Sequence, residues 1–250
     1  MAERWGTRIG GMLSGLPSTV VVAFSFIAVT QGAEQAYLAT ESFPLTFSFN
    51  AIAVAAYLAL ARHGSAAGLT GLVLAWLALQ AGFVAFARAV QPVTHGMSFI
   101  LWLLVLVAMT ATLRKFFPVP FAKGSAHAHS RGELAGRAAF CGFVIAGAVL
   151  SAMISGPLGD AVLAAFPAVL VTTLAIAAIA ARAESVAFAR SLCLPLMLSG
   201  MANCVVFAVA FHFLILRWGL AQTVTASLLL TAVSSAGVYA YLQRLRDSAA

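Results

Sequence analysis

The chain is built from long apolar stretches that are separated by short polar breaks. Eight stretches approach or exceed the roughly 20 residues that a membrane-spanning helix needs. The stretches are too long and too uniform for barrel strands, and backbone groups in lipid must be satisfied within each segment, so the pattern predicts helices. The fold class expected is an all-α transmembrane bundle of about eight spans. The spans cover approximately residues 12–31, 37–61, 66–87, 97–113, 138–155, 161–181, 186–214 and 223–243.

Turn-forming and charged residues stand between the predicted spans, at residues 32–34, 62–65, 91–92 and 156–160. The longest break is a basic linker at residues 114–136, which we expect on the cytoplasmic side. It divides the chain into an N-terminal half with spans one to four (residues 1–113) and a C-terminal half with spans five to eight (residues 137–250). The linker carries His127 and His129, but two histidines alone do not make a metal site.

Composition supports a membrane location. Hydrophobic residues make up 62% of the 250 positions and charged residues only 8%, whereas a soluble domain carries about 25% charged residues. These values exclude a soluble globular domain, a disordered chain and a disulfide scaffold, and they make the lipid bilayer the first expected partner. The net charge of +7 does not indicate nucleic acid as a partner, because the cations are sparse and lie in short breaks.

The positions of Lys and Arg predict the orientation of the chain. With a cytoplasmic N-terminus, eight spans place only Arg88 and Arg217 of the 14 cations on the far side of the membrane. Cytoplasmic loops are enriched in Lys and Arg. We therefore expect a multi-pass protein of the bacterial inner membrane, with both termini in the cytoplasm.

Two parts of the chain resemble each other. In both, a proline is followed 17 residues later by the glutamate of an Ala–Glu pair, and the next span carries Pro-Leu-x-x-Ser and then an asparagine. Spans one to three therefore resemble spans six to eight, and the copies are inverted because span one enters from inside and span six from outside. Inverted repeats are typical of secondary transporters; chance matches in Ala-rich helices are the alternative. The matched positions are Pro17, Glu34, Pro44, Ser48 and Asn50 in the first copy and Pro167, Glu184, Pro195, Ser199 and Asn203 in the second.

Prolines and uncharged polar residues are candidates for a binding site. A proline frees a carbonyl and kinks a helix, and the ends of broken helices bind ions or carboxylates in transporters. The alternative is a packing kink, which is common in membrane helices. Hydroxyl and amide groups either bind substrate or hydrogen-bond their own or a neighbouring helix. The candidates are Pro17, Pro44, Pro167 and Pro195 as kinks, and Ser18, Thr19, Asn50, Thr172, Thr173 and Asn203 as substrate ligands.

Ionisable residues inside a span are costly to bury and often functional. Glu41 lies at the start of span two, where we expect it to bind a proton or another cation. Glu34 and Glu184 occupy equivalent positions of the two copies, where they either cap helix N-termini or couple transport to protons. His212 lies inside an apolar run, which favours an interhelix hydrogen bond over catalysis.

Enzyme signatures are absent from the sequence. It contains no His-Glu-x-x-His, no Gly-x-Ser-x-Gly, no phosphate-binding loop and no dinucleotide-binding glycine set. The three cysteines lie in apolar runs without a pair at metal spacing. We therefore expect neither catalysis nor a metal or cofactor.

Residues 156–241 resemble the small GlpM-type bacterial membrane proteins. The shared pattern is a turn glycine, Phe166–Pro167, an apolar span, Glu184 and then Arg190. Those proteins are about half as long, so the chain resembles a two-copy relative. The resemblance implies an inner-membrane protein linked to envelope polysaccharide production, and it supplies no catalytic residue.

Two functions follow as hypotheses. The first is a small secondary transporter of a small solute or a lipid-linked substrate, with its site between spans one, two, six and seven near Pro17 and Pro167. In this hypothesis Glu41 binds a proton or cation, and Asn50 and Asn203 bind substrate. The second is a non-catalytic accessory subunit of an envelope polysaccharide or lipid assembly system, with a membrane enzyme as its partner. A homo-oligomer is compatible with both.

Overall fold

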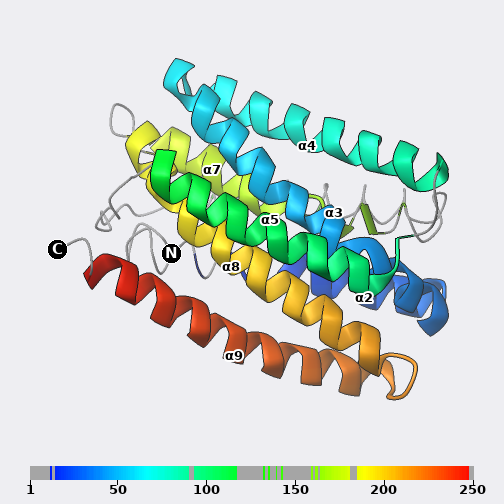
Figure 1. The fold of residues 1–250 in the computed structure, drawn as a ribbon. Helices are drawn as coiled ribbons and strands as arrows, with labels where there is room; N and C mark the ends of the chain where they lie inside the picture. Colours follow the sequence, from blue (N-terminus) through cyan, green and yellow to red (C-terminus); the bar gives the residue numbers. More distant parts are fainter. Residues whose placement is uncertain are drawn as a thin grey trace.

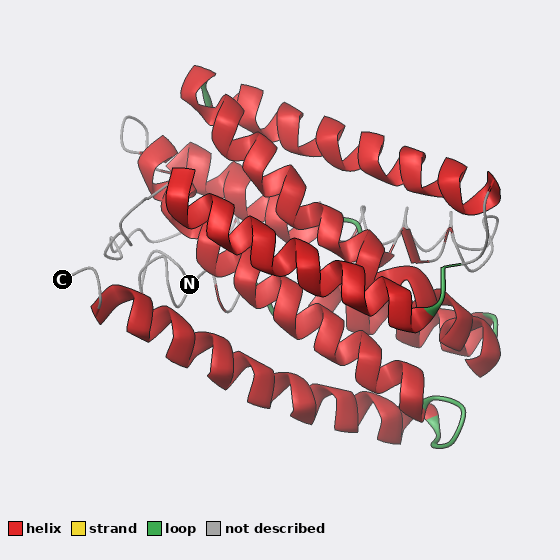
Figure 2. Ribbon diagram, viewed as in Figure 1, coloured by secondary structure: helices red, strands yellow, loops and turns green. Residues whose placement is uncertain are grey.

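A computed structural model describes residue 12, residues 15–89, 93–116, 164–180 and 185–247, and isolated positions between 132 and 162. Within these ranges the chain forms seven α-helices and one short 3-10 helix, and no strand (Figure 2). The fold is thus a helical bundle. The elements are α2 (Ser18–Thr30), α3 (Ala33–Leu60), η1 (Ala61–His63), α4 (Ser65–Ala89), α5 (His95–Phe116), α7 (Ala168–Ala180), α8 (Ser185–Leu214) and α9 (Leu220–Asp247).

Five helical segments are long and apolar enough to cross a membrane, which makes the chain a multi-pass membrane protein. They cover Ala33–His63, Ser65–Ala89, His95–Phe116, Ser191–Leu214 and Leu220–Leu245. Helices occupy seven of the eight predicted spans, and the predicted fifth span lies outside the described residues. Helices α2 and α7 begin later than the apolar stretches do, because Pro17 and Pro167 stand immediately before their first residues.

Helices α3 and α8 lie side by side at the centre of the bundle (Figure 1). Helix α4 packs along the outer side of α3, and α9 packs along the outer side of α8. Helix α5 lies against α3 and also touches α8, while α7 lies against α8 and α4. The central helices are mainly buried, whereas α4, α5 and α9 expose most of their apolar side chains. This distribution suits a bundle whose outer helices face lipid.

Glycines form the two sharp turns that flank α3. Gly32, between α2 and α3, has a φ of 97°, and Gly64, between η1 and α4, has a φ of 118°. Residues with a Cβ rarely adopt such angles, so glycine allows the chain to reverse within one or two residues here. Both glycines lie in polar breaks that the sequence predicts.

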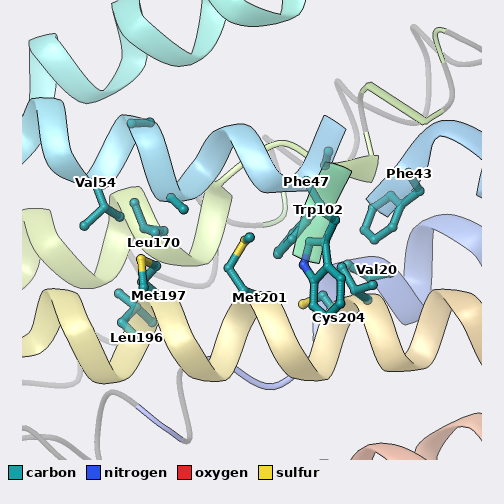
Figure 3. Close-up of a cluster of buried hydrophobic side chains, with 14 of the residues drawn as sticks. Val20, Phe43, Phe47, Val54, Trp102, Leu170, Leu196, Met197, Met201 and Cys204 are labelled. Atoms are coloured by element: carbon teal, nitrogen blue, oxygen red, sulfur yellow. The ribbon is translucent and has the colours of Figure 1, made fainter. Parts of the chain in front are cut away.

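The core between α3 and α8 is filled with large apolar side chains (Figure 3). Met201 of α8 points toward Phe47 of α3, Met197 of α8 lies beside Leu170 of α7, and Trp102 of α5 belongs to the same core. Phe24 of α2 extends this core by packing its ring against Phe43 and Phe211 at centroid distances of 5.1 and 5.6 Å. The core thus joins helices from both halves of the chain.

Candidate functional site

The backbone turns before α2 and before α7 have matching hydrogen bonds. Ser18 N–H donates to the Leu16 carbonyl and Val21 N–H to the Pro17 carbonyl, both at 2.8 Å. Their counterparts 150 residues later, Ala168 and Val171, donate to Phe166 and Pro167, again at 2.8 Å. Both helices have 13 residues. Each proline therefore stands immediately before a helix, in which the N–H groups of the second and third residues are left for another acceptor.

Asn50, near the middle of α3, connects α3 to the turn before α7. Its side-chain amide donates to the Ala165 carbonyl at 3.1 Å, and the residue is 4% exposed. Its Oδ1 atom has no hydrogen-bond partner among the described residues. A buried amide oxygen without a partner is costly, so a ligand or a water molecule that donates a hydrogen bond to it would be stabilising.

Ser199, near the middle of α8, connects α8 to the segment before α2. Its hydroxyl donates to the Met12 carbonyl at 2.6 Å and accepts from the Asn203 amide at 2.9 Å. Gly15 approaches this point so closely that a Cβ there would lie 2.6 Å from the backbone nitrogen of Gly200. Each central helix therefore holds the proline turn of the other half of the chain.

A cavity of about 40 Å³ lies between these two turns and the central helices. This volume has room for about three water molecules. The cavity is at the middle of α3 and α8. It is lined by Gly15, Leu16, Thr19, Phe47, Asn50, Phe166, Pro167, Val169, Leu170, Leu196, Met197, Gly200, Met201 and Cys204.

The chemistry of the cavity is apolar with a polar end. Phe47, Leu170, Met197 and Met201 form apolar walls (Figure 3), whereas Asn50 offers an amide. The first turns of α2 and α7 also border the cavity, and helix N-termini carry partial positive charge. This arrangement suits a small molecule with an apolar body and a compact polar group that can donate a hydrogen bond to Asn50 Oδ1.

Of the predicted site residues, Thr19, Asn50 and Pro167 line the cavity. Pro195 is adjacent to the lining residue Leu196, and Asn203 is fully buried behind the cavity, against Ser199. Pro44 lies inside α3, one turn before Phe47. The cavity is thus bordered by α2, α3, α7 and α8, and it contains three of the predicted residues.

The other predicted residues lie elsewhere. Ser18 and Pro17 line a separate groove of about 340 Å³ between α2 and α9. Thr172 donates its hydroxyl to the Ala168 carbonyl of its own helix at 2.8 Å, and the half-buried Thr173 is not among the described cavity residues. Glu34 and Glu41 lie in the first two to three turns of α3, away from the cavity, and Glu184 lies outside the described residues.

A second group of polar side chains lies where α3 and α5 begin and α8 ends, and the sequence did not predict that these side chains meet. We call Tyr37, Thr40, His95 and His212 the histidine cluster. The His95 and His212 rings stack with centroids 4.0 Å apart and planes 5° apart, and the Tyr37 ring stacks on His212 at 4.2 Å. Thr40 Oγ1 lies 2.9 Å from His212 Nδ1.

One sequence signal for this cluster exists. Pro44 has no N–H, so the carbonyl of Thr40, four residues earlier, loses its helical donor. His95 Nδ1 lies 3.3 Å from that carbonyl. From the sequence alone, Pro44 predicts that the Thr40 carbonyl needs another donor, but it does not predict which helix supplies that donor.

The described residues contain no group of three or more side chains placed to hold a metal ion. No protein-family model, curated protein or solved structure matches this chain.

Proposed function

We propose that the protein is a small secondary transporter of the bacterial inner membrane, with eight spans and the cavity between α3 and α8 as its binding site. The observation that carries the proposal is the pair of matched proline turns at one cavity. In transporters, helices broken near the membrane midplane supply backbone groups to the substrate.

The packing of the helices supports two inverted repeats, α2–α4 and α7–α9. Helix α4 packs on α3 as α9 packs on α8, and α2 touches α9 as α7 touches α4. Helices α3 and α8 are then the equivalent helices of the two repeats, and they pack against each other at the pseudo-two-fold axis. Under this topology the histidine cluster faces the extracytoplasmic side.

The roles in the cavity follow from its lining. The Asn50 amide binds the polar group of the substrate, with the first-turn N–H groups of α2 and α7 beside it. Phe47 and Met201 surround the apolar part. The substrate class is a small solute, or the head of a lipid-linked molecule, that combines both features. Asn203 positions Ser199 and the turn before α2, and Glu41 lies outside the cavity lining.

Native cysteines allow a test that needs no known substrate. Cys193 and Cys204 are both buried in α8, but only Cys204 is among the described residues that line the cavity. In sealed right-side-out and inverted vesicles, a membrane-impermeant maleimide should modify a variant that retains only Cys204 from both sides. The matched control, a variant that retains only Cys193, should react about tenfold more slowly, because thiol reactivity follows access.

The alternative, an accessory subunit of an envelope assembly system like that implied by the GlpM resemblance, predicts a different result. Cys204 would then react no faster than Cys193 from either side, and the protein would purify with a membrane enzyme in fixed ratio. Modification of Cys204 from one side alone would also overturn transport by alternating access.

A further inference from the structure

We propose that the stacked pair His95–His212 binds the coupling proton of the proposed transporter, and that the Pro44 kink of α3 transmits its binding to the cavity. The inference rests on the proposed function, because coupling presupposes transport. The geometry of the histidine cluster and its contacts beside Pro44 support this inference.

Hydrogen bonds define the neutral state of both imidazoles. The Tyr37 carbonyl can only accept, so the Thr40 hydroxyl, at 2.5 Å, donates its proton there. Thr40 Oγ1 is then left as the acceptor of the hydrogen bond from His212 Nδ1–H. His95 Nδ1–H likewise donates to the Thr40 carbonyl. Both rings therefore carry their hydrogen on Nδ1 and leave Nε2 to accept a proton.

The vacant acceptor is visible at His95. Its Nε2 atom is buried and has no hydrogen-bond partner among the described residues, while the ring as a whole is half-buried. A buried polar atom without a partner is unusual unless it has a role. Histidine is the side chain whose ordinary titration falls between about pH 5 and 8, so this position suits reversible proton binding.

The stack limits the pair to one proton. The ring centroids are 4.0 Å apart, and two positive charges at that distance repel strongly in a poorly hydrated site. His212, with 5% exposure, also lies between His95 and Tyr37. These three are the titratable groups that face one another here, and Glu34 and Glu41 form no ion pair with either histidine in the described part of the chain. The proton therefore belongs to the pair.

The pair reaches the cavity through α3. The carbonyl that His95 contacts is the one freed by Pro44, and Ser98, one turn later on α5, accepts from Leu45 N–H at 2.9 Å. Helix α5 thus holds α3 on both sides of its kink. Phe47 and Asn50, one to two turns beyond Pro44, line the cavity. A proton on His95 makes its bond to Thr40 charge-assisted and stronger, which fixes the kink and closes this end of the bundle.

Titration of the pair can be measured directly. Asparagine can supply an N–H donor in place of Nδ1–H but does not titrate, so His95→Asn and His212→Asn are the conservative variants. In lipid nanodiscs, ¹⁵N-histidine spectra of the five histidines should show the His95 and His212 signals changing together between about pH 4 and 8, a window widened because both rings are packed among other groups. Each variant should shift the titration of the remaining partner. Signals that stay constant over this range, or that titrate independently, would overturn the proton site.

Coupling is tested by the accessibility of Cys204. Because only the thiolate reacts, each labelling rate is divided by the rate of free cysteine with the same reagent at the same pH. From the extracytoplasmic side, this ratio should be about fivefold lower at pH 5 than at pH 8, and His95→Asn should abolish that change. Glu41→Gln and the matched control His63→Asn, an exposed histidine at the other end of α3, should retain it. If Glu41→Gln alone loses the pH dependence of Cys204 labelling, the coupling proton binds to Glu41 and not to the histidine pair. If the histidines titrate as a pair but the labelling rate of Cys204, relative to free cysteine, does not change with pH, the coupling is overturned. If Cys204 reacts from one side only, or from neither side, transport is overturned. The histidine spectra then still decide whether the pair binds a proton.

Discussion

The turns before α2 and before α7 share a backbone conformation but are held in different ways. The turn before α2 is held by close packing, because Gly15 lies directly on the backbone of α8 and Ser199 contacts the Met12 carbonyl. The turn before α7 has an alanine at the matching position, and its carbonyl is held by the side chain of Asn50. The turn before α2 thus combines a close backbone approach with a hydrogen bond, whereas the described contact from α3 to the turn before α7 is a hydrogen bond, and the two turns should respond differently to substitution.

The surroundings of the turns differ as well. Beside α7, Trp76 of α4 packs edge-on against Phe166 at 5.0 Å and fills the space. Beside α2, the neighbouring helix α9 carries Thr231, and a groove of about 340 Å³ remains. The space beside α7 is thus filled by a side chain, whereas a groove remains beside α2.

The largest effect should come from adding a single carbon at the tight turn. In Gly15→Ala the new Cβ would lie 2.6 Å from both the Gly200 nitrogen and the Ser199 Cβ. Backbone atoms must shift to relieve this overlap, so we expect a loss of about 1–3 kcal/mol or more in the free energy of unfolding. Equilibrium unfolding with dodecyl sulfate in mixed micelles measures it.

Gly200→Ala is the matched control for that prediction. A Cβ at Gly200 has no atom within 4 Å, and alanine favours a helix by up to about 1 kcal/mol relative to glycine. We therefore expect equal or higher stability. Equal losses in the two variants would contradict the view that the turn before α2 depends on close approach.

The helices could be predicted from the sequence to a large extent because lipid imposes a simple rule. A segment without water must satisfy its own backbone, so apolar runs mark helices and glycines such as Gly32 and Gly64 mark the turns. Helix starts were less accurate, because α2 and α7 begin only after Pro17 and Pro167, inside the apolar runs. The cavity lies beside the two helix starts that follow these prolines.

The histidine cluster could not be predicted in the same way. Thr40 and His212 are 172 residues apart, and their contact depends on how α3 and α8 cross. Likewise, His95 begins a helix whose packing against the Pro44 kink follows from three-dimensional fit. A sequence pattern records which residues share a helix face, but it does not record which face of another helix they meet.

An intermediate effect should distinguish the two asparagines. The Asn50 amide bonds a carbonyl in the other half of the chain, whereas the Asn203 amide bonds Ser199 in its own helix. Asn50→Ala leaves the Ala165 carbonyl without this donor, and we expect a loss of about 1–2 kcal/mol. Asn203→Ala should lose about half as much, because Ser199 retains its bond to the Met12 carbonyl. The same unfolding measurement compares them, and a larger loss in Asn203→Ala would reverse the contrast between the two turns.

The smallest effect should come from removing the hydrogen bond that α5 makes to α3 beside Pro44. At Pro44, Ser98 of α5 is fully buried and accepts from the backbone of Leu45 at 2.9 Å. Ser98→Ala removes that acceptor, and interhelix hydrogen bonds in membrane bundles contribute about 0.6 kcal/mol on average. Thr110→Ala, also on α5, is the control, because its hydroxyl only donates to the Leu106 carbonyl of its own helix and its loss should be near zero. If the two variants unfold at the same detergent fraction, α5 does not brace the Pro44 kink, and the mechanical link from His95 to Asn50 through α3 loses its support.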